Sequence, residues 1–140
     1  MSDPSVMRAG LLAVAAISAQ PVLADCTRFD ELDAFAEIGV APAEANCKTY
    51  LTSNAATGTA CHWAFPFRED AARSFAEVLW SDLMRCRTGA ALGPNAQVNH
   101  PDSYDLREWQ TSPAIYAMSV KDKGGLNRTL VFLRTEPRKP

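Results

Sequence analysis

The sequence lacks most of the motifs by which enzymes and cofactor-binding proteins are recognised. It has no Walker A loop, no G-x-G-x-x-G fingerprint, no H-E-x-x-H pair and no EF-hand loop. A G-x-S-x-G nucleophile elbow and a C-x-x-C redox motif are also missing, and there are only two histidines. These absences disfavour nucleotide-dependent, zinc-protease and thioredoxin-like activities, and the sequence predicts no cofactor.

Long apolar runs and basic stripes are missing as well. No stretch approaches the roughly 20 apolar residues that a permanent membrane-spanning helix needs. The formal net charge is −2, and no basic stripe with interleaved aromatic residues occurs, so we expect no nucleic-acid partner. The 140 residues are 47% hydrophobic and 21% charged, which is typical of one small globular domain.

The charges are nevertheless distributed unevenly. Residues 25–80 hold four basic and nine acidic side chains, a net of −5, whereas residues 81–140 hold nine basic and six acidic, a net of +3. We interpret the basic side chains of residues 120–140 as the solvated face of an edge hairpin followed by a basic tail. The alternative is that this polarity attracts an acidic partner or an anionic membrane surface.

Residues 1–24 have the organisation of a secretory signal peptide. Arg8 supplies a positive n-region, and an apolar run from Ala9 to Ala19 follows it. Val22 and Ala24 occupy the −3 and −1 positions of a signal-peptidase site. The sequence therefore predicts a signal peptide that is cleaved after Ala24.

Three alternatives stay open for this segment. Met7 could be the true start, because a chain that begins there has a shorter n-region, more typical of a signal peptide, than one that begins at Met1. A lipoprotein would use Cys26, although the charged Asp25 precedes it where lipid-modified cysteines usually have a small uncharged residue. A buried N-terminal helix would retain the segment. We expect a single exported domain, residues 25–140, in the periplasm or secreted.

The predicted mature chain keeps four cysteines, Cys26, Cys47, Cys61 and Cys86. An even number of cysteines in an oxidising compartment predicts two disulfides. Their spacings of 21, 14 and 25 residues lack the close pairs that structural zinc sites use, so we expect no metal. Four cysteines permit three pairings, and the spacing alone selects none of them.

Two segments carry the periodicity of amphipathic helices. Residues 25–39 place apolar side chains on one face and acidic ones on the other, with Gly39 as a natural end. Residues 69–87 form a longer apolar stripe, with Gly89 as the predicted C-cap. Residues 40–60 are expected to be a loop, part of which could form one or two helical turns.

Four segments are predicted to be strands, from period-two alternation or from β-branched and aromatic content. They are residues 61–67, 103–110, 114–120 and 129–135. Pro66 cannot donate a ladder hydrogen bond, so the first strand lies at an edge or ends there. The glycines of residues 121–128 suit a tight turn between the last two strands.

The order of these elements predicts the fold class. We expect a small two-layer α+β domain, stapled by disulfides and preceded by an N-terminal helix. Its antiparallel sheet has the order strand–helix–three-strand meander, with the helix of residues 69–87 packed on one face. Cys61 and Cys86 lie on the apolar faces of their strand and helix, so we favour a Cys61–Cys86 disulfide, which leaves Cys26 to pair with Cys47.

The adjacent Cys61 and His62 suggest a nucleophile and its base. Neighbouring side chains on a strand point to opposite faces, however, so these two cannot readily form a hydrogen bond. A catalytic thiol must also be free and partly exposed. We therefore interpret Cys61 as a structural residue and predict no catalytic residue in the chain.

A polar stretch ahead of the second predicted strand is the best candidate for ligand binding. His100 and Asp102 are the right residue types for a hydrolytic or metal site, although such residues also build turns. Tyr104 and Arg107 could contribute to the same site. Trp109, in the least regular strand, is the best candidate for an exposed aromatic contact.

These features predict a non-catalytic binding or interaction module that recognises an envelope protein or a small ligand. One alternative is a small hydrolase or metal-dependent enzyme that uses His100 and Asp102. Another is an inhibitor-like or envelope-accessory protein whose hairpin or sheet edge docks onto a partner. The coarse α+β pattern is shared by too many folds to imply one function.

Overall fold

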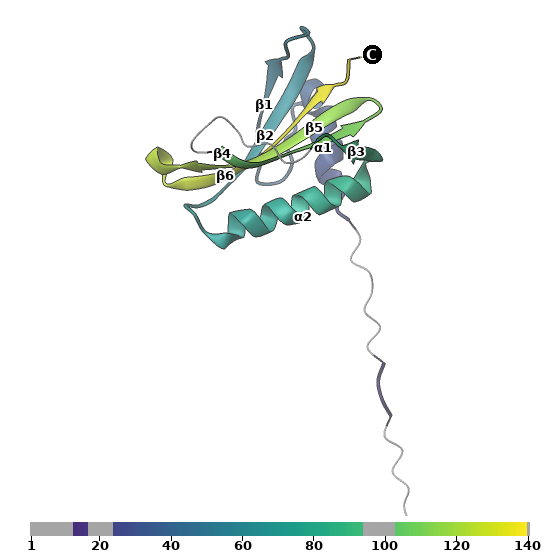
Figure 1. The fold of residues 1–140 in the computed structure, drawn as a ribbon, viewed down its shortest axis with the longest axis vertical. Helices are drawn as coiled ribbons and strands as arrows, with labels where there is room; N and C mark the ends of the chain where they lie inside the picture. The colour runs from purple at the N-terminus through teal and green to yellow at the C-terminus, as the bar shows by residue number, and fades with distance from the viewer. Residues whose placement is uncertain (1–12, 17–23, 94–102, 140) are drawn as a thin grey trace, which may run out of the picture.

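The computed structural model describes residues 13–16, 24–93 and 103–139 of the chain (Figure 1). The elements, in chain order, are α1 (Thr27–Ile38), β1 (Asn46–Leu51), β2 (Thr57–Pro66), α2 (Asp70–Cys86), β3 (Gly89–Ala91), β4 (Ser103–Thr111), β5 (Ala114–Lys123), the 3-10 turn η1 (Gly124–Leu126) and β6 (Arg128–Pro137). The fold is an α+β domain with two disulfides, as the sequence predicts.

The strands form one antiparallel sheet in the order β1-β2-β6-β5-β4-β3. The β5–β6 hairpin is therefore central, and the interpretation of residues 120–140 as an edge hairpin is wrong. The strand β2 is also internal and ends at Pro66, where the missing N–H stops the ladder. The two edges of the sheet are the short strands β1 and β3.

Both helices contribute to a hydrophobic core on one face of the sheet. Figure 1 shows α2 running beneath the strands. The core side chains come from α1, α2 and the helix-side positions of three strands, namely Phe29, Leu32, Cys61, Trp63, Ala72, Ala76, Leu79, Leu83, Tyr116, Met118, Val120, Val131 and Leu133. No helix in the described ranges lies on the opposite face, which we call the helix-free face.

The helix ends follow the sequence signals only in part. Gly39 caps α1 in the left-handed conformation, with φ of 67°, as predicted. At the end of α2, Arg87 is extended and Gly89 already belongs to β3, opposite Thr111. The predicted Gly89 cap is thus wrong, because the chain passes directly from the helix into a strand. At the β5–β6 turn, Asn127 takes the positive φ of 51° that the sequence predicts for glycine.

The segment of residues 40–60 is not the predicted loop with helical turns. Asn46–Leu51 forms β1, and β2 begins four residues before the predicted strand, at Thr57. The turn between them is closed by a hydrogen bond of 2.8 Å from the Thr52 N–H to the Ala56 carbonyl. The strand β1 is an edge strand that is mostly exposed on both faces, so it has no apolar alternation to reveal it.

The disulfides join Cys26 to Cys86 and Cys47 to Cys61, so the favoured pairing is wrong. Cys47 lies directly opposite Cys61 across β1 and β2, with Cα atoms 4.1 Å apart. Cys26 immediately precedes α1 and meets the last residue of α2 at a Cα distance of 5.4 Å. Two disulfides suggest an oxidising, extracellular environment. Neither α1 nor α2 is long and apolar enough to cross a membrane.

Candidate ligand-binding site

The helix-free face of the sheet carries a pocket of about 420 Å³, which we call the sheet-face pocket. Its lining side chains alternate along each strand with the core residues, so strand geometry alone directs them away from the helices. The lining residues are Lys48, Tyr50, Ala60, Leu106, Ala117, Ser119, Lys121, Phe132 and Arg134. They come from β1, β2, β4, β5 and β6.

The pocket is hollow because small side chains flank a large one. Arg134 in β6 is paired with Ala60 of β2 on one side and with Ala117 of β5 on the other. Each alanine offers only a methyl group, so a depression forms beside the exposed arginine. Lys48 is opposite Ala60 on the edge strand, two strand spacings or about 10 Å from Arg134.

Three cationic side chains line this pocket, and none of them has an acidic partner among the residues that the structure describes. Lys48, Lys121 and Arg134 form no hydrogen bond or ion pair with any other residue in the described ranges. The Lys121 Nζ instead lies 5.1 Å from the ring centroid of Phe132, a cation–π contact. The described part of the pocket therefore combines positive charge with an apolar floor.

Tyr50 forms one wall of the pocket because Gly58 leaves room for its ring. The Tyr50 hydroxyl donates a hydrogen bond of 3.1 Å to the Glu136 carboxylate, across β2. A Cβ atom added at Gly58 would lie 2.5 to 2.8 Å from atoms of the Tyr50 ring and hydroxyl. Glycine is required at position 58 because any larger residue would collide with the Tyr50 side chain.

His62 lies on the same face of the sheet, where its ring contacts the ring of Phe132. Its ring centroid is 5.2 Å from that of Phe132, the residue opposite it in β6. Burial, and then the positive charge of Lys48, hold the pKa of His62 below its ordinary value. Cys61 is fully buried on the other face, so the two adjacent side chains are separated as the sequence predicts.

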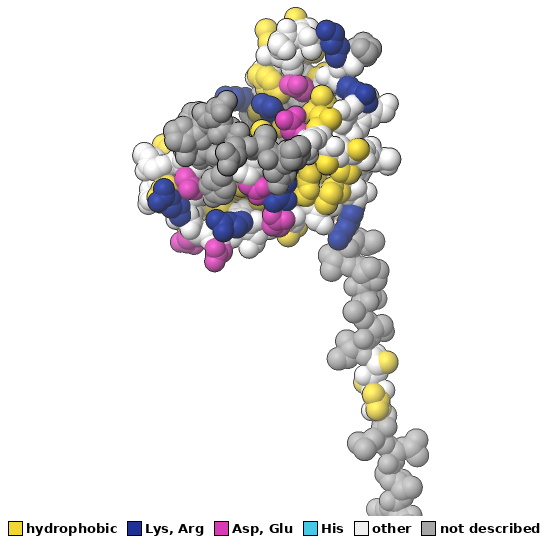
Figure 2. Space-filling model, viewed as in Figure 1, with side chains coloured by type: hydrophobic (Ala, Val, Ile, Leu, Met, Phe, Trp, Pro, Cys, Tyr) yellow, Lys and Arg dark blue, Asp and Glu magenta, His cyan; other side chains and the backbone are white. Residues whose placement is uncertain are grey.

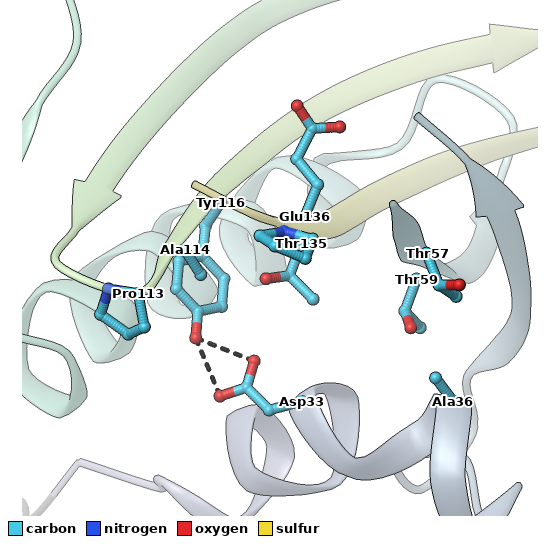
Figure 3. Close-up of a pocket in the computed structure, with 10 residues that line it drawn as sticks. Asp33, Ala36, Thr57, Thr59, Pro113, Ala114, Tyr116, Thr135 and Glu136 are labelled. Atoms are coloured by element: carbon cyan, nitrogen blue, oxygen red, sulfur yellow. Dashed lines mark hydrogen bonds between the residues drawn. The ribbon is translucent and has the colours of Figure 1, made fainter. Parts of the chain in front are cut away.

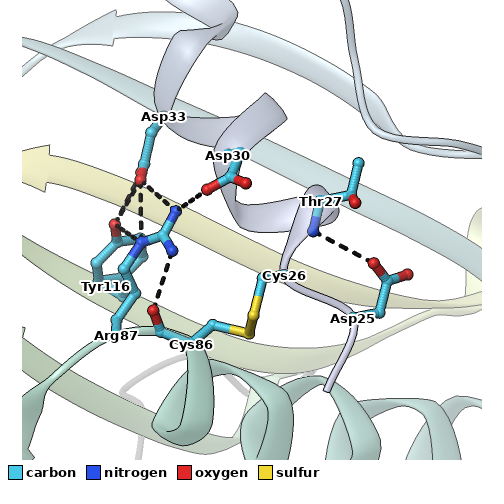
Figure 4. Close-up of a disulfide and its surroundings, with 8 residues drawn as sticks. All are labelled: Asp25, Cys26, Thr27, Asp30, Asp33, Cys86, Arg87 and Tyr116. Atoms are coloured by element: carbon cyan, nitrogen blue, oxygen red, sulfur yellow. Dashed lines mark hydrogen bonds and ion pairs between the residues drawn. A yellow bond between two sulfur atoms is a disulfide. The ribbon is translucent and has the colours of Figure 1, made fainter. Parts of the chain in front are cut away.

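A polar network on the helix side fixes α1 to the rest of the domain (Figure 4). Arg87, just after α2, donates to Asp30 at 2.7 Å and to Asp33 at 3.0 Å. The buried Tyr116 of β5 donates to the Asp33 carboxylate at 2.8 Å. Burial, and then the charge of Asp33, raise the pKa of Tyr116 to about 12. With the adjacent Cys26–Cys86 disulfide, this network explains why α1 is held in place.

The residues predicted to bind a ligand are not all described. His100 and Asp102 lie outside the described residues, and Tyr104 is described only as a backbone position opposite Val120. Their role in ligand binding stays a prediction. Of the residues described, no group of three or more His, Cys, Asp and Glu side chains is arranged to hold a metal ion.

Arg107 and Trp109 lie on the helix side of β4 and are engaged with α2. Arg107 forms ion pairs with Glu77 and, at 2.8 Å, with Asp105. The Trp109 indole N–H donates to the Arg87 carbonyl at 3.0 Å, and its ring meets Trp80 edge-to-face at 6.1 Å. Leu106 reaches the sheet-face pocket, whereas its neighbour Arg107 and Trp109 do not line it.

Sequence reasoning missed the residues of the sheet-face pocket. The excess of basic residues after residue 80 includes Lys121 and Arg134, but it does not indicate that they line a pocket. Lys48 comes from the acidic part of the chain and from a strand that was not predicted. Only the strand order and register bring Lys48 to the same face as the other two cations.

Comparison with known proteins adds no relative to these observations. No family model, no curated protein and no solved structure matches the chain. The fold and the sheet-face pocket therefore carry the functional argument.

Proposed function

We propose that this chain is exported through a signal peptide, residues 1–24, and that residues 25–140 form a non-catalytic module that binds a small organic anion in the sheet-face pocket. The observation that carries the proposal is the set of three cationic side chains, Lys48, Lys121 and Arg134, that line one pocket without acidic partners in the described ranges. The two disulfides support an oxidising environment.

The shape and chemistry of the pocket favour an anion with an apolar part. Its volume of about 420 Å³ lies within the usual range of small-ligand pockets, about 300–1,000 Å³. A carboxylate, sulfate or phosphate group would accept charge-assisted hydrogen bonds from Arg134 and Lys48. The apolar part of the ligand would lie over Ala60, Ala117 and Phe132, where methyl groups and a ring line the pocket.

The same pocket gives no support to a hydrolytic mechanism. A general base needs a hydrogen-bonded proton donor or a positioned water, and usually an orienting partner. His62, which does not line the pocket, has no hydrogen bond to any other residue within the described ranges, and its ring contacts that of Phe132. Binding of an envelope protein or small ligand is therefore the function class that we favour.

The binding proposal is tested by nuclear magnetic resonance titration of the processed protein. Benzoate and octanoate serve as anionic probes, and benzamide serves as the neutral analogue of benzoate. We expect saturable shifts of the amides of Ala60, Ala117 and Arg134 with both anions. Benzamide should bind about tenfold more weakly, and added salt should weaken benzoate binding.

Charge variants provide the matched control. Arg134→Gln and Lys48→Gln should each weaken benzoate binding about tenfold, the loss of about one charge-assisted hydrogen bond. Arg85→Gln removes the same charge from an exposed position of α2 and should leave binding unchanged. Failure of both anions to give saturable shifts, or equal losses in all three variants, would overturn the proposal.

Export is tested separately by expressing the full chain in a bacterial host and sequencing the N-terminus of the protein recovered from the periplasm. We expect the mature chain to begin at Asp25. Recovery of an unprocessed chain in the cytoplasm would overturn the export proposal and would leave the ligand proposal to its own test.

A further inference from the structure

A second cavity lies on the opposite side of the sheet, between α1 and the end of strands β2, β5 and β6 (Figure 3). Its volume is about 310 Å³, and we call it the helix-side cavity. Thr59, Thr135 and Tyr116 form one continuous row across the three strands. On α1, Ala36 offers only a methyl group toward this row. The cavity forms where small side chains on the sheet face a small side chain on the helix.

Two threonine hydroxyls of this cavity differ from the other buried threonines. Thr111 exchanges hydrogen bonds with Ala114, and Thr129 bonds with Asp122 and with the Arg68 N–H. Thr59 and Thr135 are only 3% and 8% exposed, yet their hydroxyls have no hydrogen-bond partner among the described residues.

Buried hydroxyl groups normally have partners, and leaving one unpaired costs about 1–3 kcal/mol. Neither hydroxyl oxygen is among the fully enclosed polar atoms that lack a partner, so both are reached from the cavity. Their hydrogen-bonding capacity is therefore available to a molecule that occupies it. A threonine hydroxyl both donates and accepts, which matches another hydroxyl better than it matches an ion.

The carboxylate on the wall of the cavity already has hydrogen-bond and ion-pair partners, although its cation, Arg87, is shared with Asp30. The Asp33 carboxylate accepts from the Tyr116 hydroxyl at 2.8 Å and pairs with Arg87 at 3.0 Å. Figure 3 shows Asp33 and Tyr116 directed toward one another on one side of the cavity, with the Glu136 carboxylate pointing away from it. Glu136 accepts from Tyr50. The charged residues of the lining are both acidic, which disfavours an anionic ligand, while the Thr59 and Thr135 hydroxyls favour a neutral hydroxylated one.

We infer that the helix-side cavity binds a neutral, polyhydroxylated small molecule of monosaccharide size. Ligand hydroxyls would exchange hydrogen bonds with Thr59 and Thr135, and one would donate to the remaining acceptor capacity of Asp33. The carbon skeleton of the ligand would contact the rings of Pro113 and Pro137, which border the cavity. The volume is at the lower end of the usual range for ligand pockets, about 300–1,000 Å³, which favours a single sugar ring.

This inference is independent of the anion binding proposed for the sheet-face pocket, because the two cavities lie on opposite faces of the sheet. The test is a titration of the isotope-labelled, processed protein with D-glucose, D-galactose and N-acetyl-D-glucosamine. We expect at least one sugar to cause saturable shifts of the amides of Thr57, Thr59 and Thr135. Benzoate should leave these amides unchanged, and Lys48→Gln, which alters the other face, should leave sugar binding unchanged.

Three variants decide whether the binding belongs to the cavity. Thr59→Val and Thr135→Val replace the hydroxyl with a methyl group of similar size, and each should weaken sugar binding about tenfold. Ala36→Phe fills the cavity from an exposed helix position and should abolish binding while the domain stays folded. The inference is overturned if none of the three sugars gives saturable shifts. It is also overturned if binding persists at full strength in the valine and phenylalanine variants.

Discussion

The Tyr116 hydroxyl lies 2.8 Å from both carboxylate oxygens of Asp33, although 83 residues separate them in the sequence. The contact connects α1 to the central strand β5. Arg87 contacts both groups, since its Nε donates to the Tyr116 oxygen at 3.3 Å and to Asp33 at the same distance. Tyr116 is 2% exposed as a residue, whereas the Asp33 side chain is 37% exposed, so the hydrogen bond to this charged group is partly shielded from water.

Removing this phenol should therefore lower stability measurably. We expect Tyr116→Phe to reduce the free energy of unfolding by about 1.5–3 kcal/mol, the usual contribution of a hydrogen bond to a charged group. Tyr50→Phe is the matched control, because it removes the half-exposed bond to Glu136, and should cost less than about 1 kcal/mol. Urea unfolding of both variants measures the difference. Equal losses would mean that burial does not strengthen the Tyr116 contact.

The disulfide connectivity has a direct chemical test. Trypsin cleaves after Arg28, Lys48, Arg68, Arg85 and Arg87, so each cysteine falls in a different peptide. Without reduction, the peptide of residues 29–48 should remain linked to that of residues 49–68 through Cys47 and Cys61. The dipeptide of residues 86–87 should remain linked to the peptide that ends at Arg28. A link between residues 49–68 and 86–87 would contradict this structure, and mass spectrometry distinguishes the two outcomes.

The wrong prediction of a Cys61–Cys86 disulfide shows that local sequence patterns do not indicate which strands pair. The two helices and the strands β5 and β6 were predictable because each has a pattern of residues within its own segment. The strand β1 has no apolar alternation, so Cys47 was not placed on a strand. Without β1, nothing indicated that Cys47 would lie directly opposite Cys61. Cys61 and Cys86 do face one core, as predicted, but each bonds to a different partner.

The candidate site was hidden for a related physical reason. Ligand sites on a sheet are built from residues that are neighbours across strands, and strand order and register are long-range properties. Lys48 and Arg134 share a face only because Ala60 is opposite both of them. The fold class follows from local patterns, whereas the pocket follows from the pairing of elements distant in sequence.

The lowered pKa of His62 should make the free energy of unfolding depend on pH in mild acid. Because burial and Lys48 lower its pKa in the folded protein, the unfolded chain binds a proton at higher pH than the folded one. The free energy of unfolding should therefore fall as the pH decreases below the ordinary histidine pKa of about 6.5. His62→Gln should remove this part of the pH dependence, which urea unfolding across the range measures.

A second variant separates the two causes of the lowered His62 pKa, which are burial and the charge of Lys48. Lys48→Gln removes the charge but leaves the burial, so the pKa of His62 should rise part of the way toward its ordinary value. The proton resonances of the His62 ring report this value directly. A His62 that titrates at or above its ordinary pKa in the unmodified protein would contradict the arrangement of this face.

The threonines of β6 provide an internal comparison of paired and unpaired hydroxyls. Thr129 is fully buried, and its hydroxyl accepts from the Arg68 N–H and donates to Asp122, both at 2.8 Å. Thr129→Val should lower the free energy of unfolding by about 1–3 kcal/mol, because it removes both of these hydrogen bonds from a buried position. Thr135→Val removes a hydroxyl with no described partner, and should leave stability unchanged or slightly raised.

The two valine variants change the same strand by the same atoms, so β-propensity and side-chain volume are matched. The difference between them in urea unfolding thus isolates the hydrogen bonds, provided that the slope m is unchanged. Equal losses at both positions would mean that the Thr135 hydroxyl is already satisfied within the folded protein. In that case the helix-side cavity would lose one of its two unpaired hydroxyls, and the sugar-binding inference would lose its main support.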